Sequence, residues 1–255
     1  MIDIHSHILP GIDDGAQVLE DSLDMARQAV SEGIHTLIAT PHHQNGKYIN
    51  EKNSIVQRVD QLNVELKKHK IPLTILPGQE SRIYGELVED YIEGKVLTLN
   101  DNHKYVFIEF PSSQVPRYAE QLLFDVQSEG LTPIIVHPER NSKLLENPDL
   151  LYNFVNKGAL TQVTAASVTG RFGKKIKKFS LDLINANLTH VIASDAHNVS
   201  GRNFLMAEAM DVIRKEYGMD MIEQFYSNAL AITDGAVCFK ESPEKIVKKK
   251  FLGIF

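Results

Sequence analysis

The chain begins with two histidines, His5 and His7, that are separated by one residue and lie at the end of a short apolar run. Side chains of a β-strand alternate between its two faces, so both imidazoles of a His-x-His pair point the same way. Two imidazoles held side by side can bind one metal ion without rearrangement of the backbone. The pair becomes informative because similar residues follow later apolar runs.

Histidine, aspartate and glutamate recur where six of seven predicted strands end. The candidate metal ligands are His5, His7, Asp14, His42, Glu80, Glu109, His137, Asp195 and His197. Imidazoles and carboxylates without a thiolate suit Mn²⁺, Fe²⁺, Zn²⁺ or Co²⁺, and they argue against copper(I) and iron–sulfur centres. Nine ligands exceed what one ion can use. The sequence therefore predicts two or three ions that share a carboxylate.

Two arginines near these residues indicate the chemistry. Metal ions roughly 3.5–4 Å apart can activate water and neutralise charge on a transferring phosphoryl group. Arg140 lies three residues after His137, where its guanidinium can bind phosphate oxygens in bidentate fashion. Arg202, seven residues after Asp195 at the predicted start of a helix, is a second catalytic candidate, with an ordinary surface role as the alternative.

The elements that must position these residues are short β-rich runs that alternate with helical patterns. The predicted strands cover residues 2–4, 36–39, 73–76, 105–109, 133–136, 159–163 and 191–193. The predicted helices cover residues 17–33, 50–69, 117–129, 149–156, 174–186, 204–217 and 220–227. Such alternation predicts an α/β fold with a parallel sheet, and seven units fit one barrel whose site lies at the carboxyl ends of the strands. An open doubly wound sheet is the alternative, but no Gly-x-Gly-x-x-Gly loop follows the first strand.

The composition limits the class of protein. The chain has no run of about 18 apolar residues and no apolar leader, so we expect no membrane span and a cytoplasmic location. Cys238 is the only cysteine, which rules out an intrachain disulfide and fits a reducing compartment. The net charge of −6 argues against a general nucleic-acid binder. Lysines cluster at residues 174–178 and 248–250, where a solvated surface is the plain interpretation.

Several motifs together resemble a known superfamily. They are His5-Ser-His7, Thr40-Pro-His42, Gly78-Gln-Glu80, His137-Pro-Glu-Arg140 and Ser194-Asp195-Ala-His197. This series resembles the polymerase-and-histidinol-phosphatase (PHP) superfamily, which implies a distorted (β/α)7 barrel with a trinuclear metal site. More narrowly, residues 5–15, 82–87 and 170–173 resemble the manganese-dependent tyrosine phosphatases encoded with capsule and exopolysaccharide genes in Gram-positive bacteria. The resemblance runs from residue 1 to about residue 240, so we expect one domain over residues 1–255 with a peripheral tail.

The resemblance also implies ligand sets and a substrate. One ion would be held by His5, His7, Glu80 and Asp195, a second by Glu80, Glu109 and His137, and a third by Asp14, His42 and His197. The implied activity is Mn²⁺-dependent hydrolysis of phosphotyrosine, on the C-terminal tail of a bacterial tyrosine kinase. No Cys-x5-Arg loop follows Cys238, so a cysteine nucleophile is not expected.

Other functions stay open at this point. Within the superfamily, the alternatives are a histidinol-phosphate phosphatase and a nuclease-like domain. In a different class, the chain would be a non-catalytic, metal-stabilised regulator that docks on a kinase. Tyr48, Tyr84 and Phe172 are candidates to line a cleft for an aromatic substrate ring, with core packing as the alternative for each.

Overall fold

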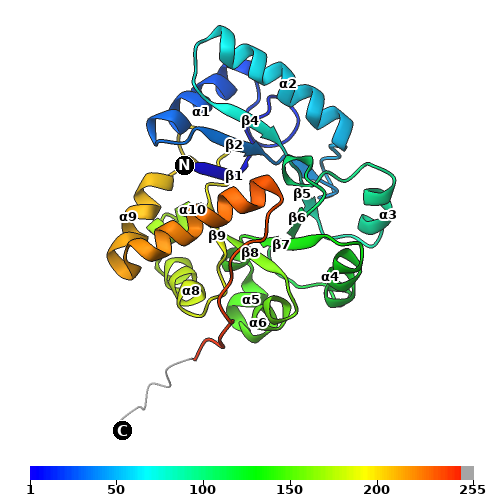
Figure 1. The fold of residues 1–255 in the computed structure, drawn as a ribbon, viewed down its shortest axis with the longest axis vertical. Coiled ribbons are helices and arrows are strands. Elements are labelled where there is room, and N and C mark those ends of the chain that lie inside the picture. The colour runs from blue at the N-terminus through cyan, green and yellow to red at the C-terminus, as the bar shows by residue number, and fades with distance from the viewer. Residues whose placement is uncertain (248–255) are drawn as a thin grey trace.

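The computed structural model describes residues 1–247, which fold into two parallel sheets and surrounding helices (Figure 1). The first sheet has the order β1-β2-β4, and its strands are β1 (Ile2–Ser6), β2 (Thr36–Ala39) and β4 (Thr74–Pro77). The second has the order β3-β5-β6-β7-β8-β9, with β3 (His42–His43), β5 (Glu80–Arg82), β6 (Tyr105–Glu109), β7 (Thr132–Val136), β8 (Leu160–Thr164) and β9 (Val191–Ala193). Every strand pair is parallel, which confirms the predicted α/β class.

The two sheets adjoin each other in two places. The chain passes from β2 into β3 and from β4 into β5 after only two residues each time. Gly78 makes the second passage possible, because a Cβ there would lie 2.7 Å from Cγ2 of Ile38. At the other edge Ser6 pairs with Ala196, and the backbone N–H of His7 donates to the carbonyl of Ala196 at 2.8 Å. The sequence predicted seven strands and missed β3 and β5, since two or three polar residues carry no apolar alternation.

The helices agree with the predicted ones except where they are very short. They are α1 (Leu19–Ser31), α2 (Lys52–Lys68), α3 (Leu87–Ile92), α4 (Ala119–Ser128), α5 (Ser142–Glu146), α6 (Asp149–Asn156), α7 (Ala165–Thr169), α8 (Lys174–Asn185), α9 (Met206–Tyr217) and α10 (Met219–Asp234), with 3-10 turns η1 (Leu99–Asp101) and η2 (Pro138–Arg140). The missed helices α3, α5 and α7 are too short to show a helical period. The predicted end of α10 at residue 227 was wrong, because Asn228 continues the helix as far as Gly235, whose φ of 69° ends it.

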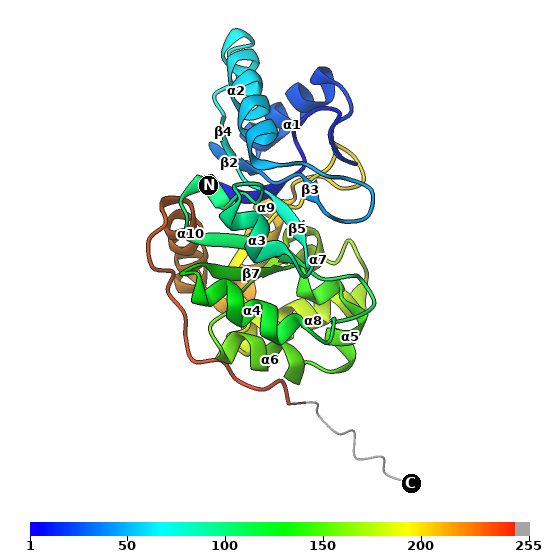
Figure 2. The same cartoon turned by 90° about the vertical axis from the view of Figure 1, so that its right-hand side faces the viewer.

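Two apolar cores stabilise this arrangement. The inner one joins Ile4 and Ile38 of the first sheet to Phe107 of the second. Ala229 and Ile232 of α10 pack onto the same cluster, near the first residues of β6, β8 and β9. Figure 1 shows α10 in front of the strands, and Figure 2 shows it on the side away from β3 and β5. Helix α10 therefore covers the amino ends of the strands and leaves the carboxyl ends to the loops.

A larger outer core lies between the sheets and the other helices. The apolar residues at helical spacing in α1 and α2 are buried there, among them Leu23 and Ala26 in α1 and Ile55, Val59 and Leu62 in α2. Within residues 1–247, no helix is both long and apolar enough to cross a membrane. The lysines at 174–178 lie in the first turns of α8, while those at 248–250 fall outside the described residues.

Candidate metal centre

The nine predicted ligands converge at the carboxyl ends of the strands. Seven of them form three sets, and the ligand atoms within each set lie within 4.8 Å of one another: His7, Asp14, His42 and His197; His5, His7 and Glu80; and His42, Glu80 and Glu109. The other two lie beside these sets, His137 next to Glu80 and Asp195 next to His5. The strands that supply them are adjacent in space although the residues span most of the sequence, as expected for parallel strands whose carboxyl ends share one face. The structure therefore brings together the side chains that the sequence singled out.

Glu80, the first residue of β5, lies at the centre of this cluster. Its Oε2 atom is 3.6 Å from Nε2 of His5 and 3.3 Å from Nε2 of His7, and its Oε1 atom is 2.8 Å from Nε2 of His137. Asp195 Oδ1 lies 3.4 Å and 3.3 Å from the same nitrogens of His5 and His7. Donor atoms bound to one ion at about 2.1 Å stand roughly 3.0–3.5 Å apart, so these separations suit a common metal.

Hydrogen bonding supports the same conclusion. The Nε2 atoms of His5 and His7 and the Oε2 atom of Glu80 are buried and have no hydrogen-bond partner among residues 1–247. Buried polar atoms in folded proteins are nearly always bonded, because an unpaired one loses its interaction with water without compensation. A metal ion would provide the missing interaction for all three atoms, and the donor set fits Mn²⁺, Fe²⁺, Zn²⁺ and Co²⁺.

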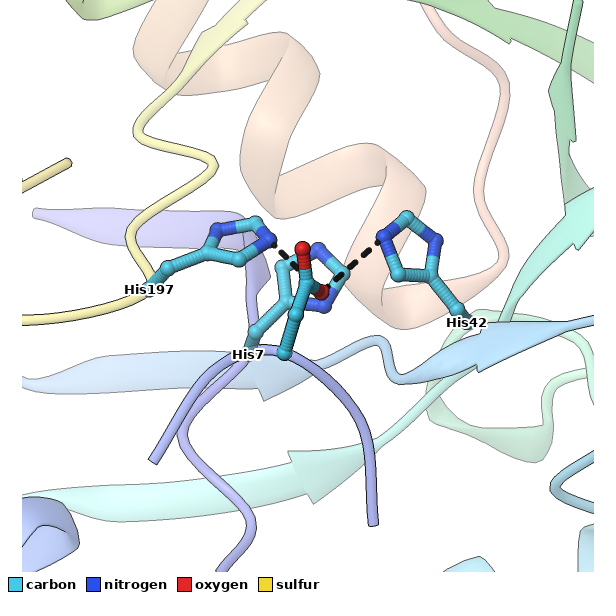
Figure 3. A group of neighbouring side chains, drawn as sticks. His7, His42 and His197 are labelled. Carbon is cyan, nitrogen blue, oxygen red and sulfur yellow. Dashed lines mark ion pairs between the residues drawn. The ribbon is translucent and has the colours of Figure 1, made fainter. Parts of the chain in front are cut away.

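Asp14 forms the more exposed side of the cluster. Its Oδ1 atom lies 3.3 Å from Nε2 of His42 and 3.3 Å from Nε2 of His197, and Figure 3 marks both ion pairs with dashed lines. The figure shows the imidazoles of His42 and His197 approaching from opposite sides, with His7 between them. The side chain of Asp14 is 44% exposed, so solvent reaches the cluster here.

Asp13 fixes the orientation of His7. Its Oδ2 atom lies 2.7 Å from Nδ1 of His7, which must carry the proton because a carboxylate only accepts. The Nε2 atom of His7 is therefore free to bind a metal. Asp13 also accepts hydrogen bonds from the backbone N–H groups of Gly15 and His42. Asp13 lies in a turn that needs Gly15, because a Cβ there would overlap the carbonyl of His7.

Gln162 plays the same part for His5, and the sequence analysis missed it. Its Oε1 atom accepts from Nδ1 of His5 at 2.9 Å, and the residue is fully buried in β8. The available signal was a carboxamide in the middle of an otherwise buried strand. His197 is oriented differently, with Nδ1 2.9 Å from the carbonyl oxygen of Asp195.

Two of the ligand-type residues have left-handed backbone conformations. The φ angles are 36° at His137 and 53° at Asp195, values that residues with a Cβ rarely adopt. Hydrogen bonds hold both positions, from the N–H of His137 to the carbonyl of Gln162 and from the N–H of Asp195 to the carbonyl of His5. Such strain costs about 1 kcal/mol per residue and concentrates at functional sites. Here it turns each side chain sharply into the cluster at the end of its strand.

The electrostatics differ between the ligand imidazoles. Although burial opposes the change, the Asp13 carboxylate raises the pKa of His7 well above its usual range and the Glu80 carboxylate raises the pKa of His42 to about 10, so these two rings would release a proton when a metal binds. Burial lowers the pKa of His137 and of His197 to about 4, so both rings are neutral near pH 7. Although burial disfavours their charge, nearby cations hold the pKa of Glu80 and of Asp195 well below its usual range. Burial and the Glu80 charge raise the pKa of Glu109 to about 7, and Glu109 also faces Nε of Arg82 at 3.2 Å.

Both predicted catalytic arginines contact one carboxylate. Asp195 Oδ2 lies 2.5 Å from Nη2 of Arg140 and 3.1 Å from Nη2 of Arg202, while Oδ1 faces the histidines. The predicted place of Arg202 at a helix start was wrong, because α9 begins only at Met206. Arg202 lies in the preceding loop, where Oδ1 of Asn198 accepts from its backbone N–H at 3.1 Å.

A cavity of about 250 Å³ opens beside the arginines. Phe110, Pro138 and Leu144 contribute apolar surface to its lining, and Arg140, Arg202 and His137 contribute polar groups. Of the aromatic candidates, Tyr48 stacks on His42 with ring centres 6.3 Å apart, and the ring of Phe172 lies 5.5 Å from Cζ of Arg140. Tyr84 lies elsewhere, with its hydroxyl donating to Asp90 at 2.9 Å.

Comparison with known proteins identifies the family. The family described as "Capsular polysaccharide synthesis, CpsB/CapC" matches residues 1–234. The chain belongs to the CpsB/CapC family. Over the full length of both chains it is 51% identical to the tyrosine-protein phosphatase YwqE of Bacillus subtilis and 35% identical to the putative tyrosine-protein phosphatase CapC of Staphylococcus aureus. The tyrosine-protein phosphatase CpsB of Streptococcus agalactiae is 30% identical over 91% of this chain and 98% of its own length.

Comparison with solved structures also supports the assignment to the CpsB/CapC family. A crystal structure from work on YwqE of B. subtilis and CpsB of Streptococcus pneumoniae, described as metal-dependent tyrosine phosphatases, superposes with a TM-score of 0.95 at 52% identity. It covers 97% of this chain and 100% of its own. An organophosphorus hydrolase from Deinococcus radiodurans, at 12% identity and a TM-score of 0.58, shares the fold alone. The family predicted from the motifs is thus confirmed.

Proposed function

We propose that this CpsB/CapC protein is a metal-dependent tyrosine-protein phosphatase that hydrolyses phosphotyrosine in proteins. The single observation that carries the proposal is the sharing of Asp195, whose Oδ1 faces the predicted metal ligands while its Oδ2 contacts Arg140 and Arg202. A phosphoryl group beside Asp195 would meet both the metal cluster and two guanidinium groups. The names of the relatives support the phosphotyrosine substrate.

The nine ligand-type residues would hold three ions. In this proposal His5, His7, Glu80 and Asp195 bind the first ion, Glu80, Glu109 and His137 the second, and Asp14, His42 and His197 the third. His42 also lies 2.8 Å from Glu80 and 3.7 Å from Glu109, so it borders the second set as well. We propose Mn²⁺ as the resident metal. When bound, such ions lower the pKa of the attacking water and neutralise charge on the phosphoryl group.

The protein's own cations complete the site. Each guanidinium can donate two parallel hydrogen bonds to phosphoryl oxygens, which a lysine cannot do. A phosphate dianion would compete with Asp195 for Arg140 and Arg202, since all three groups meet at the edge of the cavity. The two arginines therefore bind the transferring group and stabilise the charge that builds up on it.

Direct hydrolysis without a covalent intermediate follows from the cysteine content. Cys238 is buried on the α10 side, where burial raises the pKa of its thiol to about 12. A protonated, inaccessible thiol is no nucleophile. The apolar lining contributed by Phe110, Pro138 and Leu144 gives a phenyl ring a surface to pack against, which favours an aryl phosphate over an alkyl one.

Three further proposals concern the molecule as a whole. The two sheets act as one distorted (β/α)7 barrel, which the Ser6–Ala196 pairing and the shared inner core support. Residues 1–255 form a single phosphatase domain in the cytoplasm. The substrate is the C-terminal tail of a bacterial tyrosine kinase, because an extended tail can place one phosphotyrosine at a time in a cavity of this size.

A substrate panel tests the function. The purified protein is treated with chelator, reconstituted with Mn²⁺, and assayed on a phosphotyrosine peptide, the matched phosphoserine peptide and histidinol phosphate. We expect the chelated protein to be inactive and the reconstituted protein to prefer phosphotyrosine. Equal turnover of phosphoserine, or a preference for histidinol phosphate, would favour the small-molecule phosphatase. Binding without turnover of any substrate would favour the non-catalytic regulator.

A further inference from the structure

A short basic segment, defined here as residues 171–178, has no role in the site described above. It contains Arg171 and four lysines, Lys174, Lys175, Lys177 and Lys178, and no acidic residue, in a chain whose net charge is −6. Arg171, Lys174 and Lys175 are exposed and form no ion pair with any residue that the structure describes. Lys178 pairs with Asp182 in its own helix at 2.5 Å. The segment is therefore a concentrated patch of available positive charge.

The basic segment adjoins the phosphate-binding side of the cavity. The ring of Phe172, which belongs to the segment, lies 5.5 Å from Cζ of Arg140, and α8 packs against η2, the turn that contains Arg140. Gly170 and Gly173, with φ angles of 92° and 95°, flank residues 171 and 172 at the start of the basic segment. The stem of Lys177 packs over Gly170, where a Cβ would lie 3.0 Å from its Cδ. Figure 2 shows α7 and α8 on the same side as β3 and β5, away from α10.

The placement of the charges is unfavourable for the helix itself. Lysines occupy four of the first five positions of α8, and its first turn holds no acidic residue. The amino end of a helix carries partial positive charge, so acidic residues stabilise it and cations do not. Like charges three and four residues apart on one helix also repel. A sequence arranged only for stability would not contain this run, and such local conflicts commonly mark a functional surface.

We propose that the basic segment is a docking surface for an acidic stretch of the phosphoprotein substrate, on one side of the hydrolysed phosphotyrosine. The proposal rests on the phosphatase function given above. The Cζ atom of Arg140 lies 5.5 Å from the centre of the Phe172 ring. Lys174 is two residues after Phe172, so their Cα atoms are at most about 7 Å apart. An extended peptide advances about 3.3–3.6 Å per residue. Carboxylates or phosphates three to four positions from the phosphotyrosine thus reach Lys174 and Lys175.

The experiment compares two triple variants with the same change in charge. Lys174→Gln/Lys175→Gln/Lys178→Gln removes three cations from the basic segment, and Lys67→Gln/Lys68→Gln/Lys70→Gln removes three from the carboxyl end of α2. Each variant includes one lysine from an ion pair within its own helix, Lys178 with Asp182 or Lys68 with Glu65. The substrates are p-nitrophenyl phosphate, a phosphotyrosine peptide with neutral flanks, and the same peptide with glutamates three and four positions away.

We expect the α8 variant to lose about tenfold in kcat/KM on the acidic peptide, mainly through KM, and to keep wild-type activity on the other two substrates. The loss should shrink when ionic strength rises from about 0.05 M to 0.3 M, because exposed charges are then screened. The α2 variant should match the wild type on all three substrates. Equal losses in both variants, or no preference of the wild-type protein for the acidic peptide, would overturn the proposal.

Two other outcomes also decide it. If the α8 substitutions weaken binding of single-stranded RNA or phosphatidylglycerol vesicles but leave the acidic peptide unaffected, the segment binds those polyanions and the proposal is wrong. A wild-type protein inactive on p-nitrophenyl phosphate and both peptides would contradict the phosphatase function itself. In that event, fluorescence anisotropy with the acidic peptide still tests docking separately: tighter binding to the wild type than to the α8 variant supports it, and equal binding overturns it.

Discussion

The buried polar groups at the two ends of the strands differ in their hydrogen bonding. At the carboxyl ends, buried polar atoms such as Nε2 of His5 and Oε2 of Glu80 lack hydrogen-bond partners within residues 1–247. At the amino ends, two polar side chains join the strands to the end of the chain: the hydroxyl of Tyr105 donates to the carbonyl of Ala236 and accepts from the N–H of Cys238, and Asn228 bonds the backbone of His190 and Phe239. The unpartnered atoms of His5 and Glu80 belong to sets of ligand-type side chains, whereas the unpartnered atoms at the amino end of β9, Oγ1 of Thr189 and Nε2 of His190, belong to none of these sets. The predicted metal ligands thus lie at one end of the strands, and contacts that stabilise the fold lie at the other.

The largest effect on activity should come from Glu80→Gln in the cluster of predicted ligands. Glu80 lies within 3.6 Å of ring nitrogens from four histidines, so its loss disturbs the whole cluster rather than one contact. We expect kcat to fall by at least about 10³-fold, together with metal content measured by mass spectrometry of the reconstituted protein. Glu65→Gln, at an ion pair on α2, is the control and should change neither quantity. A loss of less than tenfold would remove Glu80 from the site.

The next effect separates substrate binding from metal binding. Arg140→Lys should be nearly as damaging as Arg140→Ala, because lysine cannot make a planar bidentate contact. We expect a loss of about 10²–10³-fold in kcat/KM, or roughly 3–4 kcal/mol, with unchanged metal content. Loss of metal along with activity would show instead that Arg140 serves mainly to hold Asp195, which it contacts at 2.5 Å.

A substitution at the amino ends of the strands should lower the stability of the protein and leave its activity unchanged. Ile232 in α10 is fully buried in the inner core, so Ile232→Ala leaves a cavity. We expect the free energy of unfolding, measured by urea denaturation of the chelated protein, to fall by about 3 kcal/mol. The kcat of the folded protein should stay at the wild-type value. A parallel fall in kcat would mean that the two ends are coupled.

The smallest predicted effect depends on pH. Burial lowers the pKa of His190 to about 3, and its Nδ1 accepts from the N–H of Thr161. Because an unfolded histidine has a pKa of about 6.5, the unfolded state binds a proton that the native state refuses between these values. Stability therefore falls as pH drops below about 6.5, by roughly 2 kcal/mol at about pH 5.

The test of this effect is His190→Asn, which keeps an acceptor for Thr161 and removes the titration. Urea denaturation of the chelated wild type and variant is compared at about pH 5 and pH 7.5. The variant should lose roughly 2 kcal/mol less on acidification than the wild type. An identical pH dependence of the two proteins would exclude His190 as a source of acid sensitivity.

The sequence predicted which histidines and carboxylates would lie close together because its signal was local. A histidine or carboxylate directly after an apolar run is unusual, and parallel strands bring such positions together whatever their separation in the chain. Gln162 and Arg82 gave no comparable signal, since one polar residue inside or beside a strand has no spacing to compare with. Their roles depend on His5 and Glu109, which contact them only in the folded structure.

The division into two sheets could not be predicted from the sequence, for a related reason. The passage from β4 into β5 contains Gly78, which lies so near Ile38 that a Cβ would not fit, and this contact joins residues forty positions apart. Secondary-structure periodicity describes one element at a time and carries no information on such contacts. The predicted end of α10 was too early, and the side chain of Asn228, inside the helix, bonds to the backbone of residues 190 and 239, both of which lie outside the helix.

The position of α10 has a consequence for biosynthesis. All nine ligand-type residues precede it in the chain, the last of them being His197, while the residues that cover the inner core begin at Met219. A ribosome therefore synthesises every predicted ligand before it makes the helix that covers the amino ends of the strands. A product cut short after α9 would carry the entire ligand set on an uncovered core, with apolar surface exposed to aggregation and proteolysis. Loss of α10 alone would therefore leave the predicted ligands in the chain and uncover the inner core.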